Sequence, residues 1–307
     1  MPVPVWLGIL RSTWLSVNQR SQSETDSSCR WEPELESPGV SCKAGDPTEP
    51  VGSGIDDGVT ESVPGIQKMR NYLAFDIETA SMVEGDDWRT CRPLGITCAA
   101  ALASNNPERP ITWHGMTPEG TPANRMTKDE AKTLVEDLQT YAKQGYTLLT
   151  WNGAGFDFDV LAEEADAYPT CRHLANNHVD MMFQVLCDKG FPIGIDNAAK
   201  AMQIAGKPEG MSGALAPQLW ADKQFQTVLD YVVQDVRIAL QLAEQAEQAQ
   251  ALRWMTRRGQ IRTFDLPKGW FTVAEAITLP EPDTSWMTSP LSRQTVLQWM
   301  RPEDPHD

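Results

Sequence analysis

The sequence predicts an α/β domain in which a mixed sheet carries helices on its faces. Runs of strand character occur over 73–79, 94–101 and 110–115, and again over 146–151. Segments with helical spacing follow the third and fourth of these runs, and a long one covers 224–250. The resulting order, βββαβα, is typical of a mixed sheet flanked by helices.

Two carboxylates share one face of the first predicted strand. Side chains alternate across a strand, so Asp76 and Glu78 point to one side while Phe75 and Ile77 point to the other. Neighbouring carboxylates on an apolar strand repel each other and are costly to desolvate. A hard divalent cation between them would offset both effects. The alternative is an edge strand whose acids are solvated.

The next two strands, over 94–101 and 110–115, are expected to form a meander with the first. Thr127 and Glu130 have the spacing of a capping box, which predicts a helix that runs to about Lys143.

The fourth strand, over 146–151, leads into a Gly-rich turn and then a helix. Asp157 falls near the start of that helix, where a carboxylate suits the helix dipole. The alternative is a structural role for both residues, with Asn152 as a turn residue and Asp157 as an acid in the first turn of the helix.

Further helical segments are expected near 179–189 and 195–204, before the long helix over 224–250. On that helix Asp235 lies in an apolar stripe, where an unpaired charge is costly, and Tyr231 is one turn before it. The alternative is a tolerated boundary acid beside a core tyrosine.

Together these three clusters resemble the motifs of the DEDD superfamily of 3′–5′ exonucleases, which are DnaQ-like and have a ribonuclease H-like fold. The motifs are D-x-E, N-x4-D and Y-x3-D, which match Asp76 and Glu78, Asn152 and Asp157, and Tyr231 and Asp235. The tyrosine is typical of the DEDDy branch, and the chain looks similar to the proofreading domains of family B DNA polymerases. The resemblance covers about 70–245.

The resemblance implies phosphodiester hydrolysis with two divalent ions. These are expected to be Mg²⁺, for which Mn²⁺ can substitute. It implies that Asp76 bridges both ions and that Glu78 and Asp157 complete their shells. Asp235 would hold the ion that carries the nucleophilic water, and Tyr231 would orient that water. A phenol with an ordinary pKa near 10 is a poor general base at neutral pH.

The expected substrate is the single-stranded or frayed 3′ end of DNA, or of RNA, with DNA favoured. Thr79, Trp151, Asn152 and Phe156 are expected to contact it, although Asn152 can equally fix the turn before Asp157. The rival functions are a non-catalytic nucleic-acid-binding module and a structure-specific endonuclease on the same fold. The complete set of acids and the tyrosine favour the exonuclease, with end trimming in DNA repair as the expected setting.

Composition supports one enzyme domain with extensions. The net charge of −16 over 307 residues is unusual for a protein that binds a polyanion. The segment 253–264 is an exception, since its arginines alternate with aromatics and suit either nucleic-acid contacts or packing with solvated arginines. The loop 206–213 either touches the substrate or connects helices.

Three regions are expected along the chain. Residues 1–68 are rich in Ser, Glu, Pro and Gly and are predicted to be disordered, and we hypothesise that translation starts at Met69. The exonuclease domain covers 69–250. The extension 251–307 is expected to be partly helical and partly extended, and it either docks on the domain or binds a protein partner through Trp286 and Trp299.

The sequence predicts no membrane contact and a cytoplasmic location. No apolar run approaches the roughly 18 residues of a membrane span. The six cysteines include no C-x-x-C pair, which favours reduced thiols over a zinc site.

Overall fold

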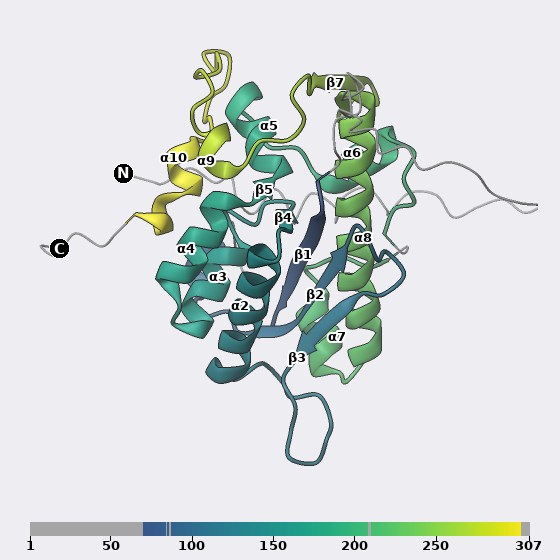
Figure 1. Ribbon diagram of the computed structural model, residues 1–307, viewed down its shortest axis with the longest axis vertical. Helices are drawn as coiled ribbons and strands as arrows, with labels where there is room; N and C mark the ends of the chain where they lie inside the picture. Colours follow the sequence, from purple (N-terminus) through teal and green to yellow (C-terminus); the bar gives the residue numbers. More distant parts are fainter. Residues whose placement is uncertain (1–69, 84, 86, 208–209, 302–307) are drawn as a thin grey trace, which may run out of the picture. The chain divides into compact units, whose positions relative to one another are not determined.

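Five strands form one mixed sheet in the order β3-β2-β1-β4-β5 (Figure 1). The central strand, β1, pairs antiparallel with β2 and parallel with β4. The computed structural model describes residues 70–83, 85, 87–207 and 210–301, so the predicted leader and Met69 lie outside the described residues. The strands are β1 (Tyr72–Thr79), β2 (Ile96–Ala103), β3 (Ile111–His114), β4 (Thr147–Thr150) and β5 (Val179–Asp180).

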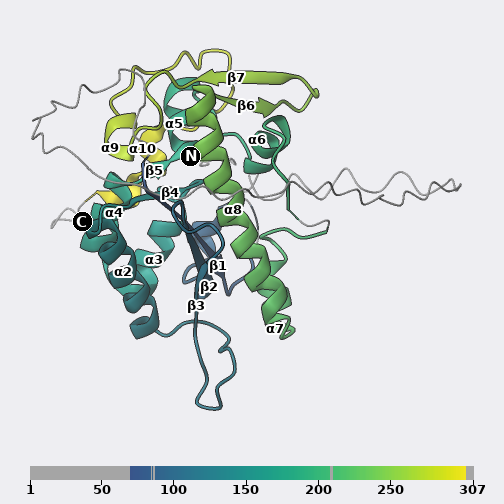
Figure 2. The same ribbon diagram turned by 45° about the vertical axis from the view of Figure 1, so that its right-hand side comes forward.

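Helices cover both faces of this sheet (Figures 1 and 2). One face packs against α6 (Ile195–Ala201), α7 (Ala216–Ala221) and α8 (Phe225–Ala249). The other face packs against α2 (Lys128–Lys143), α3 (Asp157–Ala165) and α4 (Tyr168–Asn177).

The predicted alternation along the first strand is confirmed. Tyr72 and Ala74 are buried in the cluster that contains α8, whereas Phe75 and Ile77 are buried in the cluster that contains α2. The predicted order βββαβα is also confirmed, as is the capping box at the start of α2.

Some elements differ from the prediction. The helix expected near 179–189 begins at Met181, because Val179 and Asp180 extend the sheet as β5 and Asp180 caps α5 (Met181–Lys189). A short apolar run does not distinguish a strand from a helix start. The helices α4 and α7 were not predicted.

The residues after α8 begin with an antiparallel hairpin that the sequence did not predict. It consists of β6 (Ala251–Met255) and β7 (Ile261–Asp265). Three short helical turns follow, namely α9 (Val273–Ala276), α10 (Arg293–Val296) and η2 (Gln298–Met300).

The hairpin's aromatics pack onto the domain. Trp254 and Phe264 are buried in the same cluster as Trp270, while the neighbouring arginines are exposed. Of the two alternatives for segment 253–264, packing is therefore the one observed for its aromatics. Among the described residues, no helix has the length and apolar character needed to cross a membrane.

Candidate active site

Three of the predicted acids meet where α8 crosses the central strand. Carboxylate oxygens of Asp76, Glu78 and Asp235 all lie within 4.8 Å of one another. Asp76 and Glu78 come from β1, and Asp235 comes from the helix packed on the same face of the sheet. Glu78 and Asp235 are buried, whereas Asp76 is partly exposed. The site thus combines two buried carboxylates with one that solvent reaches.

The fourth acid, Asp157, is tied to the same strand from the first turn of α3. Its Oδ1 accepts a hydrogen bond from the backbone N–H of Ile77, with a distance of 3.2 Å. Asp157 also lies near enough to Asp76 for its charge to raise the pKa of that carboxyl group. The structure therefore brings all four predicted acids together.

These carboxyl groups resist carrying negative charge at the same time. Burial raises the pKa of Asp76 well above its usual range, and the charges of Asp157, Asp235 and Glu78 raise it further. Burial also raises the pKa of Asp235. A bound cation would favour the ionised forms of all four groups.

The donor set fits a hard divalent cation. It consists of carboxylate oxygens, which Mg²⁺ and Mn²⁺ prefer, and it contains no thiolate or imidazole. Oδ1 of Asp235 is buried and has no hydrogen-bond partner in the described part of the chain. A buried carboxylate oxygen without a partner is costly unless it meets a donor or a metal ion.

Lys207 lies beside this cluster and was not among the predicted site residues. Its Nζ is 2.7 Å from Oδ2 of Asp235 and 2.7 Å from the hydroxyl oxygen of Tyr231. Burial disfavours the charged ammonium, but the carboxylate of Asp235 outweighs it, so the pKa of Lys207 is raised and the ammonium stays charged. The sequence shows a lysine in a Gly-rich loop, which does not reveal the acid that it meets.

Tyr231 remains a neutral phenol. Burial raises the pKa of its hydroxyl, and the charge of Asp235 raises it further. Its oxygen accepts a hydrogen bond from Lys207, which fixes the position of the hydroxyl group. A buried phenol whose pKa is raised is a poor general base at neutral pH.

Asp180 holds the turn that precedes α3. Its carboxylate accepts hydrogen bonds from the N–H groups of Asn152 and Ala154, each at 2.9 Å, and from that of Phe183 at 3.0 Å. Burial raises the pKa of Asp180 to about 6, and these three N–H groups oppose that shift. Sequence reasoning missed Asp180 because it lay inside an expected helix.

A chain of hydrogen bonds through Thr150 and His178 also holds this turn. The N–H of Gly153 donates to Oγ1 of Thr150 at 3.0 Å, and that hydroxyl lies 2.9 Å from Nε2 of His178. Nδ1 of His178 lies 2.6 Å from the carbonyl oxygen of Ala175. The Nδ1–H tautomer satisfies every member, because Nε2 then accepts from Thr150. Burial lowers the pKa of His178 to about 4, which keeps it neutral.

The side chains of three of the four predicted substrate contacts have partners within the protein. The Thr79 hydroxyl is buried and donates to the carbonyl of Ser81 at 3.3 Å. The indole of Trp151 donates to the carbonyl of Ile193 at 3.2 Å.

Phe156 is 6% exposed and packs edge-on against Trp88, with ring centroids 5.0 Å apart. Asn152 has a positive φ of 78°, and its Oδ1 is buried without a hydrogen-bond partner among the described residues. Asn152 is thus the member of this set whose side-chain oxygen has an unused capacity to accept a hydrogen bond.

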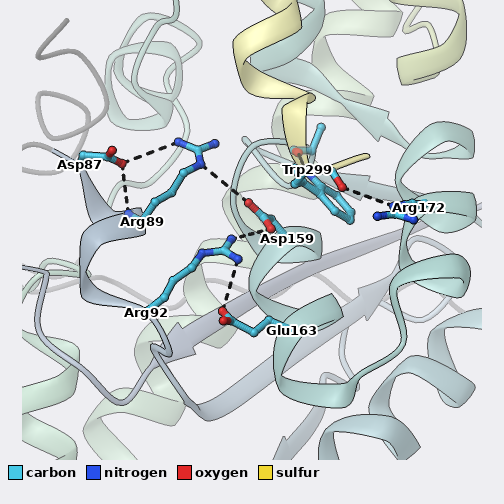
Figure 3. Close-up of polar contacts among 8 residues, drawn as sticks. Asp87, Arg89, Arg92, Asp159, Glu163, Arg172 and Trp299 are labelled. Carbon is cyan, nitrogen blue, oxygen red and sulfur yellow. Dashed lines mark hydrogen bonds and ion pairs between the residues drawn. The ribbon is translucent and has the colours of Figure 1, made fainter. Parts of the chain in front are cut away.

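Two arginines after the central strand clamp the first turns of α3 (Figure 3). Asp159 is paired with Arg92 at 2.5 Å and with Arg89 at 4.0 Å, and Arg92 also reaches Glu163 at 3.4 Å. Both guanidinium groups lie over the ring of Trp88. Asp159 is two residues after Asp157, so this buried ion pair fixes α3 against the loop that follows β1.

The C-terminal segment contacts the turn that carries Asn152. The indole of Trp299 donates to the carbonyl of Ala154 at 2.7 Å, and its own carbonyl accepts from Arg172 at 3.3 Å (Figure 3). Trp286, the other tryptophan predicted to bind a partner, is 68% exposed.

Comparisons with known proteins bear on the class of this domain. A family model of the RNase_H superfamily matches residues 111–247, a stretch that contains Asp157, Tyr231 and Asp235 but not the acids of β1. Among solved structures, the family B DNA polymerase from the hyperthermophilic archaeon Pyrobaculum calidifontis is similar, at 20% identity and a TM-score of 0.44. That alignment covers 58% of this chain and 25% of the polymerase, so the chain spans about a quarter of the polymerase's length. No curated protein matched the sequence.

The described part of the chain therefore contains a ribonuclease H-like domain. The mixed five-stranded sheet flanked by helices and the family match agree on this class. The fold and the family match support a nuclease-type function with a nucleic-acid substrate, and the acidic cluster could hold divalent ions.

Proposed function

We propose that this protein is a metal-dependent 3′–5′ exonuclease of the DEDDy type. The observation that carries the proposal is the placement of Tyr231 and Asp235 one helical turn apart, beside the carboxylates of Asp76 and Glu78. A phenol held next to a carboxylate that could bind a metal ion is placed to orient an attacking water. The resemblance to polymerase proofreading domains favours DNA over RNA.

The carboxylates of Asp76, Glu78, Asp157 and Asp235 would hold two divalent ions, Mg²⁺ or Mn²⁺. Bound ions supply an activated water, neutralise the phosphoryl oxygens and stabilise the leaving 3′ oxygen. Asp157 is kept in place by the Ile77 N–H, so this carboxylate is positioned before any ion arrives.

The remaining side chains would orient the water and the substrate and would neutralise negative charge. The hydroxyl of Tyr231, held by Lys207, would direct the water toward the scissile phosphate. Lys207 also limits the negative charge at Asp235 and would bring a positive charge close to the phosphate. Asn152 would contact the terminal nucleotide. End trimming in DNA repair is the setting we favour.

The proposal is tested with single-stranded DNA and RNA oligonucleotides labelled at the 5′ end. They are incubated with Mg²⁺, Mn²⁺ or EDTA and with the wild type, Asp76→Ala or the exposed-site control Asp129→Ala. We expect a ladder that shortens stepwise, is abolished by EDTA, is absent with Asp76→Ala and is unchanged with Asp129→Ala.

Two other outcomes would reject the proposal. Discrete internal cuts would indicate a structure-specific endonuclease. Binding without cleavage in every metal would indicate a non-catalytic nucleic-acid-binding module.

A further inference from the structure

The β6–β7 hairpin concentrates positive charge on an acidic protein. It carries Arg253, Arg257, Arg258 and Arg262 against one acid, Asp265, on a chain whose net charge is −16. All four arginines are exposed. None of them forms an ion pair with a carboxylate within the described residues. Their charge is therefore available to an external anion.

The arginines lie on both faces of the hairpin and at its tip. Arg253 pairs with Thr263 and Trp254 pairs with Arg262 across the two strands. Because neighbouring positions alternate, Arg253 and Arg262 project from opposite faces. Arg257 and Arg258 lie in the turn between the strands. Arg262 shares its face with Leu252, Trp254 and Phe264, which are buried against the domain. A ligand therefore reaches the arginines from the turn and from the outer face.

One face of the hairpin packs on the domain as far as Trp254. Leu252, Trp254 and Phe264 are buried, and the ring of Phe264 lies 6.4 Å from that of Trp270. The aromatics are thus not available to stack on bases, which leaves the guanidinium groups as the contacts the hairpin offers. Figure 2 shows both strands beside the C-terminal end of α8.

A cavity of about 470 Å³ lies at the base of the hairpin. Its polar lining consists of Gln203, Gln245, Gln248 and Arg253, and no carboxylate lines it. Amide and guanidinium groups donate hydrogen bonds to phosphate oxygens. The cavity extends the donor surface from the hairpin toward α8.

We propose that this hairpin binds the phosphate backbones on either side of a groove in a nucleic-acid duplex. The major groove of B-DNA admits a two-stranded ribbon, and entry of the turn would bring Arg257 and Arg258 to the phosphates that border the groove. Ala249 is fourteen residues after Asp235 on α8, or roughly 21 Å along the helix axis. At about 3.4 Å per base pair, this corresponds to about six base pairs. This proposal rests on the proposed function, because it places the frayed 3′ end at the acids.

The test is equilibrium binding of a DNA duplex with a frayed 3′ end, measured in EDTA between 50 and 200 mM salt (about the range over which such contacts weaken). We expect Arg257→Ala/Arg258→Ala to weaken binding about tenfold and to lower the slope of log K against log salt by about 2. Lys132→Ala/Lys143→Ala makes the same charge change on exposed positions of α2 and should leave both unchanged. Arg257→Lys/Arg258→Lys should restore most of the affinity, and thermal unfolding checks that each variant is folded.

Three results would overturn the inference. The first is an equal loss with the α2 variant, and the second is an equal loss for single-stranded DNA. The third is unchanged duplex binding together with lost binding to vesicles of anionic lipid. Since EDTA prevents metal-dependent cleavage, the result is independent of whether the acids support hydrolysis.

Discussion

The ammonium of Lys207 lies 2.7 Å from Oδ2 of Asp235, so the site contains a cation of its own beside the carboxylates. Both groups are largely buried, with 18% and 11% of their side chains exposed. Each partner therefore depends on the other for charge compensation.

We expect Lys207→Met to destabilise the protein by about 3 kcal/mol in EDTA, because Asp235 loses its counter-charge in a buried site. Mg²⁺ should recover part of this loss by supplying positive charge. Urea unfolding at neutral pH measures both effects. Lys200→Met, on an exposed position of α6, is the control. Equal stability of the two variants would show that the pair contributes nothing.

Asp76→Asn should abolish cleavage and stabilise the metal-free protein at pH 8 by about 1 kcal/mol or more. The raised pKa of Asp76 means that the folded state binds more protons than the unfolded state above the unfolded pKa. Stability in EDTA should consequently fall as pH rises toward that raised pKa, and asparagine removes this contribution.

Thermal unfolding with EDTA or Mg²⁺ provides the measurement for Asp76→Asn. Mg²⁺ should raise the melting temperature of the wild type and of the exposed-site control Asp129→Asn more than that of Asp76→Asn. An identical Mg²⁺ response in all three proteins would argue against a metal site at Asp76.

Tyr231→Phe should lower the cleavage rate by roughly tenfold to a hundredfold while leaving substrate affinity nearly unchanged. The phenyl ring keeps the packing but loses the hydroxyl that Lys207 holds. Single-turnover kinetics separate the chemical step from binding, and Tyr141→Phe on α2 is the matched control. A rate equal to that of the wild type would contradict the orienting role.

The free energy of unfolding should fall on acidification, because His178 is buried in its neutral form. Its pKa is lowered to about 4 by burial, so the unfolded state binds the extra proton between about pH 6.5 and 4. This group removes up to roughly 1.4 kcal/mol per pH unit as pH falls through that window. Urea unfolding across the window should show a smaller decline for His178→Gln than for the wild type. The exposed-site variant His173→Gln should decline like the wild type.

Trp299→Phe should cost about 1 kcal/mol of stability and slow cleavage severalfold. The variant keeps the ring but removes the indole N–H that binds the Ala154 carbonyl in the active-site turn. Trp286→Phe changes an exposed tryptophan in the same segment and should leave both properties unchanged. Cleavage rates and urea unfolding of the two variants provide the measurement. Equal behaviour of the two would show that the contact of Trp299 with the active-site turn contributes nothing.

The sequence was informative wherever function imposes a local pattern. The alternation around Asp76 and Glu78 predicted their shared face, and the helical spacing predicted that Tyr231 and Asp235 project together. These signals extend over a few residues, so one chain suffices to recognise them.

Residues that act through tertiary contacts gave no such pattern. Lys207 reaches Tyr231 from a loop, and Asp180 holds a turn that lies 26 to 28 residues before it in the sequence. The aromatics of segment 253–264 were ambiguous because stacking on a base and packing in a core require the same residue type. Burial, which depends on the whole fold, distinguishes these uses.

The central claim is that the four acids and Tyr231 remove nucleotides from a 3′ end. The most direct measurement compares two single-stranded DNA oligonucleotides of one sequence in Mg²⁺. One ends in an inverted nucleotide that removes the free 3′ end, and the other has a blocked 5′ end. We predict that the first resists degradation and the second is degraded at the rate of the unblocked strand. Equal degradation of both, or protection by the 5′ block alone, would contradict a 3′–5′ exonuclease.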